Sequence, residues 1–180
     1  MHRLLTTLAA VAVALLLVVP TVAGASPHFK HGGEPVCDVT ISGSSATTTC
    51  SGELAGLGNE DLVIVSTVSG FALYTCENRG GQQAPGQNKV LEGPSTVPTI
   101  IPSGEIKNGT VAFTTNPNTL TAAPTVSGAA AGCPNANWTG VDPTLSITAI
   151  TLTISQGGVL LFTCTAGDSD GLSGTVTLTC

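Results

Sequence analysis

Hydrophobic and polar residues alternate with a period of two along much of the chain. Residues 150–154 read Ile-Thr-Leu-Thr-Ile, and residues 175–179 read Thr-Val-Thr-Leu-Thr before the final Cys180. This period, carried by β-branched residues, is typical of strands with one buried and one exposed face. No segment after residue 25 shows the spacing of an amphipathic helix, and glycines and prolines recur between the alternating runs as turn signals.

The pattern predicts about eight to ten short strands. They cover residues 36–41, 46–51, 62–68, 71–76, 110–115, 145–154, 159–165 and 175–180, with weaker candidates near Val90 and Ile100. Such a series of strands predicts an all-β fold, an antiparallel β-sandwich of which the immunoglobulin-like arrangement is one form. A small closed β-barrel is the alternative. Residues 77–109 and 116–144, rich in Gly, Pro, Asn and Gln, are predicted to be long loops.

The first two predicted strands fix a register. With Gly43 and Ser44 at the centre of a type II′ turn, residues whose numbers add up to 87 face each other, and Cys37 lies opposite Cys50. Counting outward from the turn makes this a non-hydrogen-bonded pair, whose Cα atoms are about 4.5 Å apart and therefore within reach of a disulfide. A disulfide between Cys37 and Cys50 follows from the turn and the register.

The chain has six cysteines, all after residue 25, and an even number predicts three disulfides in an oxidising compartment. Cys164 and Cys180 face each other if the connection between their strands is centred on Leu172. Cys76 is then left with Cys133, and this bridge ties the two predicted long loops together. No two cysteines have the Cys-x-x-Cys spacing, which argues against a zinc site or a redox motif.

The N-terminus predicts export. Residues 8–19 form an apolar run too short to span a bilayer, and Ala23-Gly24-Ala25 supplies the small residues of a signal peptidase site. We therefore expect a signal peptide at residues 1–25, a flexible leader at 26–35 and a single β-sandwich domain at 36–180. The alternative is an uncleaved membrane anchor. The expected location of the mature chain is extracellular, and it is not expected to be embedded in a membrane.

Charge excludes one class of partner. After residue 25, four basic residues stand against eleven acidic residues, a formal charge of −7. The basic residues are scattered (Lys30, Arg79, Lys89 and Lys107), so the domain lacks the positive patch that nucleic acids require. Threonine supplies 24 residues of this part of the chain, and the surface is expected to be polar but largely uncharged.

Little in the sequence indicates catalysis or a cofactor. His28 and His31 are the only histidines after residue 25, and both lie near the start of this part of the chain. This argues against a histidine-based triad or a copper site. The acid pair of a glycoside hydrolase would have to come from carboxylates that are mostly isolated in sequence, among them Glu53, Glu60, Asp61, Glu77, Glu92, Glu105 and Asp142.

Three further motifs have plain interpretations. Residues 168–171, Asp-Ser-Asp-Gly, resemble part of a calcium loop but lack its later acidic ligand, and we expect a polar turn there. Asn108 and Asn137 match the N-glycosylation pattern, and we expect both to be unmodified because the leader is of a bacterial type. Outward Thr-x-Thr rows that could bind ice or a mineral are not expected, because the strand spacing is irregular.

Several segments together resemble a known group of proteins. They are His28-Phe29-Lys30, residues 50–59, residues 76–88 with Ala-Pro-Gly-Gln-Asn at 84–88, residues 105–109, and Cys-Pro-Asn-Ala-Asn-Trp-Thr at 133–139. They are similar to small secreted bacterial proteins of the actinobacterial type, β-rich and of uncharacterised function. The resemblance implies export and a β-rich domain, and it carries no activity or site.

The predicted bridge between Cys76 and Cys133 brings two amide-rich loops together. Loop clusters on a rigid sheet scaffold are where binding sites usually lie. The candidate binding residues are Gln87, Asn88, Asn135, Asn137 and Trp138. Trp138 could stack on a sugar or a peptide; alternatively it closes the end of the core while the amides cap loop backbone.

From these features we expect a secreted, non-enzymatic domain. It would act in binding or in a structural role at or outside the cell envelope, on an extracellular ligand that the sequence does not name. The alternative is a secreted hydrolase with a carboxylate site, which requires two acidic side chains facing each other in a cleft.

Overall fold

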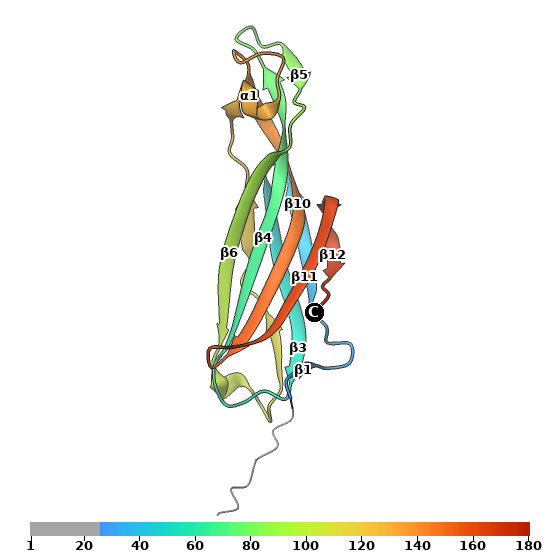
Figure 1. The fold of residues 1–180 in the computed structure, drawn as a ribbon, viewed down its shortest axis with the longest axis vertical. Helices are drawn as coiled ribbons and strands as arrows, with labels where there is room; N and C mark the ends of the chain where they lie inside the picture. Colours follow the sequence, from blue (N-terminus) through green and yellow to red (C-terminus); the bar gives the residue numbers. More distant parts are fainter. Residues whose placement is uncertain (1–25) are drawn as a thin grey trace, which may run out of the picture.

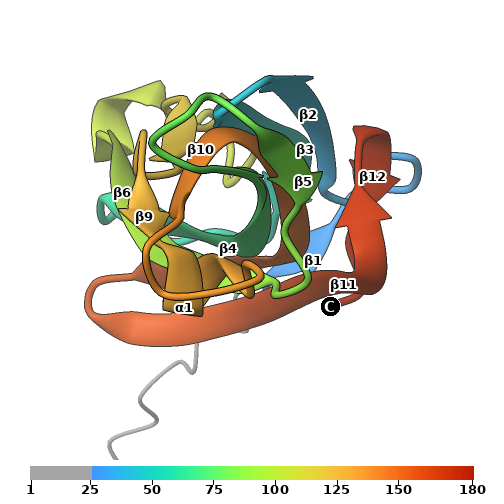
Figure 2. The same cartoon turned by 90° about the horizontal axis from the view of Figure 1, so that it is seen from above.

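The computed structural model describes residues 26–180, which form an elongated sandwich of two antiparallel sheets (Figure 1). Seen along the long axis, the two sheets curve around a common interior (Figure 2). The predicted all-β sandwich is confirmed. The predicted signal peptide lies outside the described residues. Within residues 26–180, no helix is both long and apolar enough to cross a membrane.

The first sheet is organised around β3 (Ser45–Ala55). Along one of its edges lie β1 (His28–Phe29) and β2 (Val36–Ser42), and β12 (Gly174–Thr177) pairs with the far edge of β2. The opposite edge of β3 pairs with β7 (Val111–Thr114) and β8 (Asn118–Thr121).

The second sheet is built on two long strands, β4 (Leu62–Glu77) and β10 (Thr139–Gln156), which pair over their full length. The free edge of β4 pairs with β5 (Gln83–Pro85) and β6 (Val90–Ile101). The free edge of β10 pairs with β9 (Val126–Ser127) and β11 (Val159–Leu172). A 3-10 turn, η1 (Ser103–Glu105), and a short helix, α1 (Gly128–Ala131), lie at opposite ends of the sandwich (Figure 1).

The core lies between the facing sheets. β-Branched and leucine residues at alternate positions of β4 and β10 are fully buried, as the period-two pattern predicts. They include Leu62, Ile64, Val68, Ile150, Leu152 and Ile154. The first sheet contributes buried residues that pack against them, among them Val39, Ala46, Leu54, Phe113 and Leu120.

Gly70 lies inside one long strand where two separate strands were predicted. Residues 62–68 and 71–76 were predicted as separate strands, but β4 runs through Gly70, where its register with β10 shifts. A Cβ atom on Gly70 would lie 2.0 Å from the Ser146 carbonyl oxygen of β10. The glycine therefore allows the close approach of two backbones at a bulge rather than a turn.

The two predicted long loops are largely regular structure. β5, β6 and η1 lie within residues 77–109, and β8, β9, α1 and the start of β10 lie within residues 116–144. The prediction of long loops is therefore wrong over these elements, while the weaker strand candidates near Val90 and Ile100 are confirmed as the two ends of β6. Some of the prolines that suggested a loop, such as Pro98, lie on this edge strand. Pro98 lies opposite Val65 on β4, and the outer edge of β6 pairs with no other described strand. A proline is tolerated there because the N–H that it lacks would otherwise face this unpaired edge.

The predicted hairpin is confirmed residue by residue. Val36 pairs with Ser51 and Cys37 with Cys50, and Gly43 has a positive φ of 57°, as the first central residue of a type II′ turn requires. The Cα atoms of the bonded Cys37 and Cys50 are 3.9 Å apart.

The other two disulfides also join the predicted pairs, Cys76 with Cys133 and Cys164 with Cys180. Next to the second of these, Thr165 and Thr179 exchange backbone hydrogen bonds of 2.8 and 2.9 Å, which matches the register centred on Leu172. The connection is not a simple hairpin, however. After β11 the chain crosses to the first sheet as β12, and only its last residues return to β11.

The predicted leader differs in part from the structure. Within residues 26–35, His28 and Phe29 form β1 against β3, and the Phe29 ring lies 4.7 Å from that of Phe162 on β11. Lys30 forms an ion pair with Glu53. This stretch of the chain is therefore held by both sheets rather than free along its length.

Threonines do align across the second sheet. The pairing registers place five of them in one row over β6, β4, β10, β11 and the C-terminal segment: Thr96, Thr67, Thr151, Thr165 and Thr179. The next row replaces two of these positions with Pro98 and Val65. On this sheet a single complete row therefore makes an uncharged polar stripe, and on the first sheet Thr40, Thr47 and Thr119 form a shorter row.

Candidate binding site

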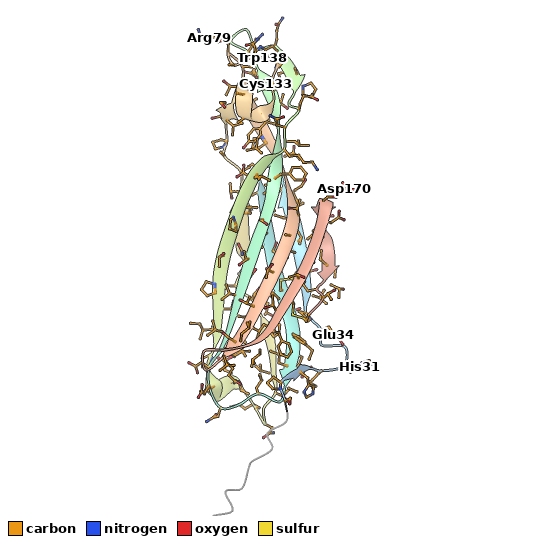
Figure 3. All side chains as sticks on the ribbon, in the orientation of Figure 1. His31, Glu34, Arg79, Cys133, Trp138 and Asp170 are labelled. Carbon is orange, nitrogen blue, oxygen red and sulfur yellow. A yellow bond between two sulfur atoms is a disulfide. The ribbon has the colours of Figure 1, made fainter. Side chains whose placement is uncertain are left out.

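The site lies at one tip of the sandwich, where β4 ends and β10 begins. The Cys76–Cys133 disulfide, with Cα atoms 5.6 Å apart, joins the end of β4 to the segment that follows α1. Arg79, Cys133 and Trp138 gather at this tip, while His31 and Glu34 lie toward the other end (Figure 3). The disulfide therefore brings together segments that are far apart in sequence.

The short helix α1 is held by capping contacts. The Ser127 hydroxyl accepts a hydrogen bond from the Ala130 amide at the N-terminus of the helix. At the C-terminus, the Ala131 carbonyl accepts from the backbone amides of Gln87 and Asn88, at 3.0 and 3.1 Å. The Asn88 side chain also donates to the Ala130 carbonyl at 3.2 Å. Gln87 and Asn88 thus fix the helix in place.

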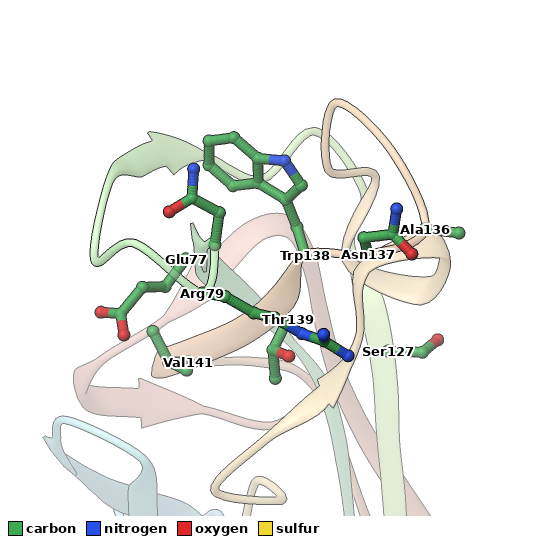
Figure 4. A pocket seen from close by; sticks show the side chains of 9 residues that line it. Glu77, Arg79, Ser127, Ala136, Asn137, Trp138, Thr139 and Val141 are labelled. Atoms are coloured by element: carbon green, nitrogen blue, oxygen red, sulfur yellow. The ribbon is translucent and has the colours of Figure 1, made fainter.

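Beside this helix is a cleft of about 420 Å³, within the range of small-molecule sites. Most of the side chains around it are polar (Figure 4). They come from the end of β4 and the residues that follow it, from β9, from the loop before β10 and from β10 itself: Glu77, Asn78, Arg79, Ser127, Ala136, Asn137, Trp138, Thr139 and Val141.

The loop that carries Trp138 is internally hydrogen-bonded. The Asn135 side-chain oxygen accepts from the Asn137 amide at 3.0 Å, and the Asn135 carbonyl accepts from the Trp138 amide at 3.2 Å. Trp138 is half-buried: it packs against the core and also lines the cleft. Both interpretations of this residue from the sequence therefore describe part of its position.

The two ionisable groups of the cleft differ in their partners. The Glu77 carboxylate accepts a hydrogen bond of 3.1 Å from the Gln83 side chain. Arg79 is exposed, and within residues 26–180 the only ion pair is that of Lys30 with Glu53, at the far end of the sandwich. The Arg79 guanidinium points toward Ser127 and Thr139, away from the Glu77 carboxylate (Figure 4).

Tyr74 supports the tip from beneath. Its hydroxyl donates to the Ala123 carbonyl at 2.9 Å and lies 3.3 Å from a Glu92 carboxylate oxygen. Burial, and then the negative charge of Glu92, raise the pKa of Tyr74 above its ordinary value of 10.0. The phenol is therefore protonated at neutral pH and holds the segment before β9 against β4.

The remaining candidate groups lie elsewhere. His28 lines a second cleft of about 490 Å³ with Asn108, which is at a tight turn. Over residues 26–180, no three His, Cys, Asp or Glu side chains gather in a way that could hold a metal ion. Asp168 and Asp170 belong to an irregular part of β11, where the Asp168 carboxylate accepts from the Asp170 amide at 2.8 Å, so the predicted polar turn is part of a strand.

Of the five predicted binding residues, the structure places Asn137 and Trp138 in the cleft. Asn135 shapes their loop, and Gln87 and Asn88 hold α1 instead of lining the cleft. Glu77 and Arg79 were not predicted as binding residues: Glu77 was considered only as a hydrolase acid, and Arg79 only as one of the scattered basic residues. A signal existed, because both lie within three positions of Cys76 and so are carried to the Trp138 loop by the predicted disulfide.

Fold and site together define a small β-sandwich that is cross-linked by three disulfides and carries a polar cleft with one tryptophan at its tip. The chain matches no protein family, and comparison with curated proteins and with solved structures gave no match either. The resemblance to secreted actinobacterial proteins stays a prediction.

Proposed function

We propose that the protein is a secreted, non-enzymatic binding domain that acts at or outside the cell envelope, and that the cleft at its tip is the binding site. The observation that carries this proposal is the half-buried Trp138 beside polar groups in a cleft that a disulfide holds in shape. An amphipathic ring with one face available is a common anchor for ligands.

The chemistry of the cleft favours binding over hydrolysis. Glycoside hydrolysis needs two carboxyl groups about 5–10 Å apart across the substrate. Glu77 is the one carboxylate among the residues that line the tip cleft, and the second cleft is lined by none. The alternative of a secreted hydrolase has no comparable support.

Co-sedimentation with an insoluble bacterial cell-envelope preparation tests this proposal. The domain of residues 26–180 should sediment with the preparation, and Trp138→Ala should lower the bound fraction severalfold. Leu91→Ala is the matched control, because Leu91 is 85% exposed and lies outside the cleft. Equal binding by the two variants would reject the cleft as the site, and steady release of soluble sugar from the pellet would favour the hydrolase.

A further inference from the structure

We infer that the cleft takes a saccharide that carries a carboxylate, such as a uronic acid unit. This inference rests on the proposed binding function and names the class of ligand for the same site. It follows from three features: a cation without an ion-pair partner, an indole in the same cleft, and a strand, β10, whose two edges are already paired there.

The first feature is Arg79. The chain has eleven acidic residues and five basic ones, so an arginine has many potential partners. Within the described residues Arg79 nevertheless forms no ion pair, and its guanidinium lies along the cleft toward Ser127 and Thr139 (Figure 4). A guanidinium offers a planar set of donors that matches a carboxylate in two parallel hydrogen bonds. The cleft therefore presents an unused site for an anionic group.

The second feature is the relation of Trp138 to the other free groups. A sugar ring has an apolar face of C–H groups, which stacks on an indole, and an edge of hydroxyls that need hydrogen-bond partners. The same cleft is lined by the Asn137 side-chain amide, the Thr139 hydroxyl and the Glu77 carboxylate, of which only Glu77 has a side-chain hydrogen bond. The cleft thus offers an apolar platform and several polar groups for one ring that has both.

The third feature argues against a peptide. Extended peptides usually bind by adding a strand to an open sheet edge, which supplies main-chain hydrogen bonds. At the cleft, Thr139 on β10 is already paired with Glu77 on β4 and with Ser127 on β9. A ligand that lies against β10 is therefore recognised through side chains, and this suits a saccharide better than a peptide backbone.

Fluorescence gives a direct assay, because Trp138 is the only tryptophan of the chain. The probes are tri-galacturonate and tri-glucuronate, the same two trisaccharides with each carboxylate reduced to an alcohol, and a tripeptide with a free C-terminal carboxylate. We expect both acidic sugars to change the emission, with affinity at least about tenfold above that of their neutral forms, as a charged hydrogen-bonded pair provides. Added salt should weaken this preference.

Variants locate the preference. Arg79→Gln should reduce the affinity for the acidic trisaccharides about tenfold and leave that for the neutral forms nearly unchanged. Arg79→Lys should keep part of the preference, because it keeps the charge without the planar donor set. Lys107→Gln removes one positive charge outside the cleft and should change nothing. Trp138→Phe, followed by calorimetry, should weaken both classes of sugar.

The outcomes separate this inference from the binding function itself. Equal affinity for acidic and neutral sugars, or a preference that survives Arg79→Gln, overturns the inference while the cleft remains a saccharide site. Binding of the tripeptide but of no sugar, lost in Trp138→Phe, overturns it in favour of a peptide ligand. If no probe binds, the inference fails; the proposed function then stands or falls on whether Trp138 is needed for sedimentation with envelope material.

Discussion

Removal of the Cys76–Cys133 disulfide should destabilise the fold more than removal of either other bridge. The three bridges join residues 57, 13 and 16 positions apart, for Cys76–Cys133, Cys37–Cys50 and Cys164–Cys180. In the chain-entropy model, a cross-link restricts the unfolded chain more as the closed loop lengthens. These loops correspond to about 4 kcal/mol for the longest and about 3 kcal/mol for each of the others.

A packing effect acts in the opposite order, and the experiment must separate the two. Cys37 and Cys50 are both fully buried, whereas Cys133 is only half-buried and Cys180 is exposed. Replacement by alanine therefore removes more buried contacts at the Cys37–Cys50 pair than at the other two pairs. The free energy of unfolding falls by roughly 1 kcal/mol for each buried group of methylene size that is lost. If packing dominates, removal of the Cys37–Cys50 pair will cause the largest loss of unfolding free energy.

Denaturant unfolding of the three double cysteine-to-alanine variants distinguishes these effects. For Cys76→Ala with Cys133→Ala we expect the largest loss of unfolding free energy, a melting temperature about 8–16 °C lower, and the largest rise in the m-value, because the unfolded chain gains the most surface. The result that refutes the reasoning is a larger loss for the Cys37–Cys50 variant with no change in m-value for any variant.

Four other predictions concern Tyr74, Thr48, Asn118 and the N-terminus of the mature chain. Tyr74 is the only tyrosine, so its ionisation can be followed by ultraviolet absorbance. Because folding raises its pKa, the stability that the protonated phenol contributes is complete below pH 10.0 and is lost as the pH rises through the higher folded value. Tyr74→Phe should abolish that part of the pH dependence of the unfolding free energy. Thr48→Val should raise the unfolding free energy by about 1 kcal/mol in urea titrations, because the Thr48 hydroxyl is buried without a hydrogen-bond partner. Asn118→Leu should instead lower it by about 2 kcal/mol, because the Asn118 amide donates to the Ser66 and Ser95 carbonyls at 2.9 and 3.0 Å; stabilisation would contradict this. Mass spectrometry of culture supernatant should find a chain that begins at Ser26, and retention of the intact leader in the membrane fraction would contradict the prediction of export.

The hairpin from Val36 to Ser51 could be predicted with its register because three local signals agree. Alternating β-branched residues, a Gly-Ser turn and two cysteines at matching distances from it all indicate the same pairing. The fold class follows from the same local patterns. The crossing of β12 to the other sheet could not be read in this way, because its partner, β2, lies at the other end of the chain.

Only some residues of the candidate site could be predicted from the sequence, again because local patterns do not give the full three-dimensional arrangement. Asn137 and Trp138 stand out by composition, and the cysteine pairing indicated which loops meet. Glu77 and Arg79 look like ordinary surface charges in the sequence, and their role depends on which way they point at the end of β4. Sequence patterns give the face of a strand but not the direction of a side chain in the residues that follow it.

The pairing of β4 with β10 has a consequence for the order of folding. Val63 and Ser155 face each other in this ladder, and the Ser155 hydroxyl donates to the Val63 carbonyl. The two residues are 92 positions apart, so much of the chain must be gathered before this part of the central strands meets. Contacts of such long range slow folding, because the loop entropy is lost before the contacts form. The Cys37–Cys50 bridge lies within one hairpin and can close earliest. In the β4–β10 ladder the separation along the chain is smallest at the tip, where Glu77 pairs with Thr139, and grows toward Leu62 and Gln156 at the other end. The Cys76–Cys133 bridge, which joins residues 57 positions apart beside that tip, should therefore close after the hairpin but before the far end of the ladder, and would hold together the two strands on which the core is built.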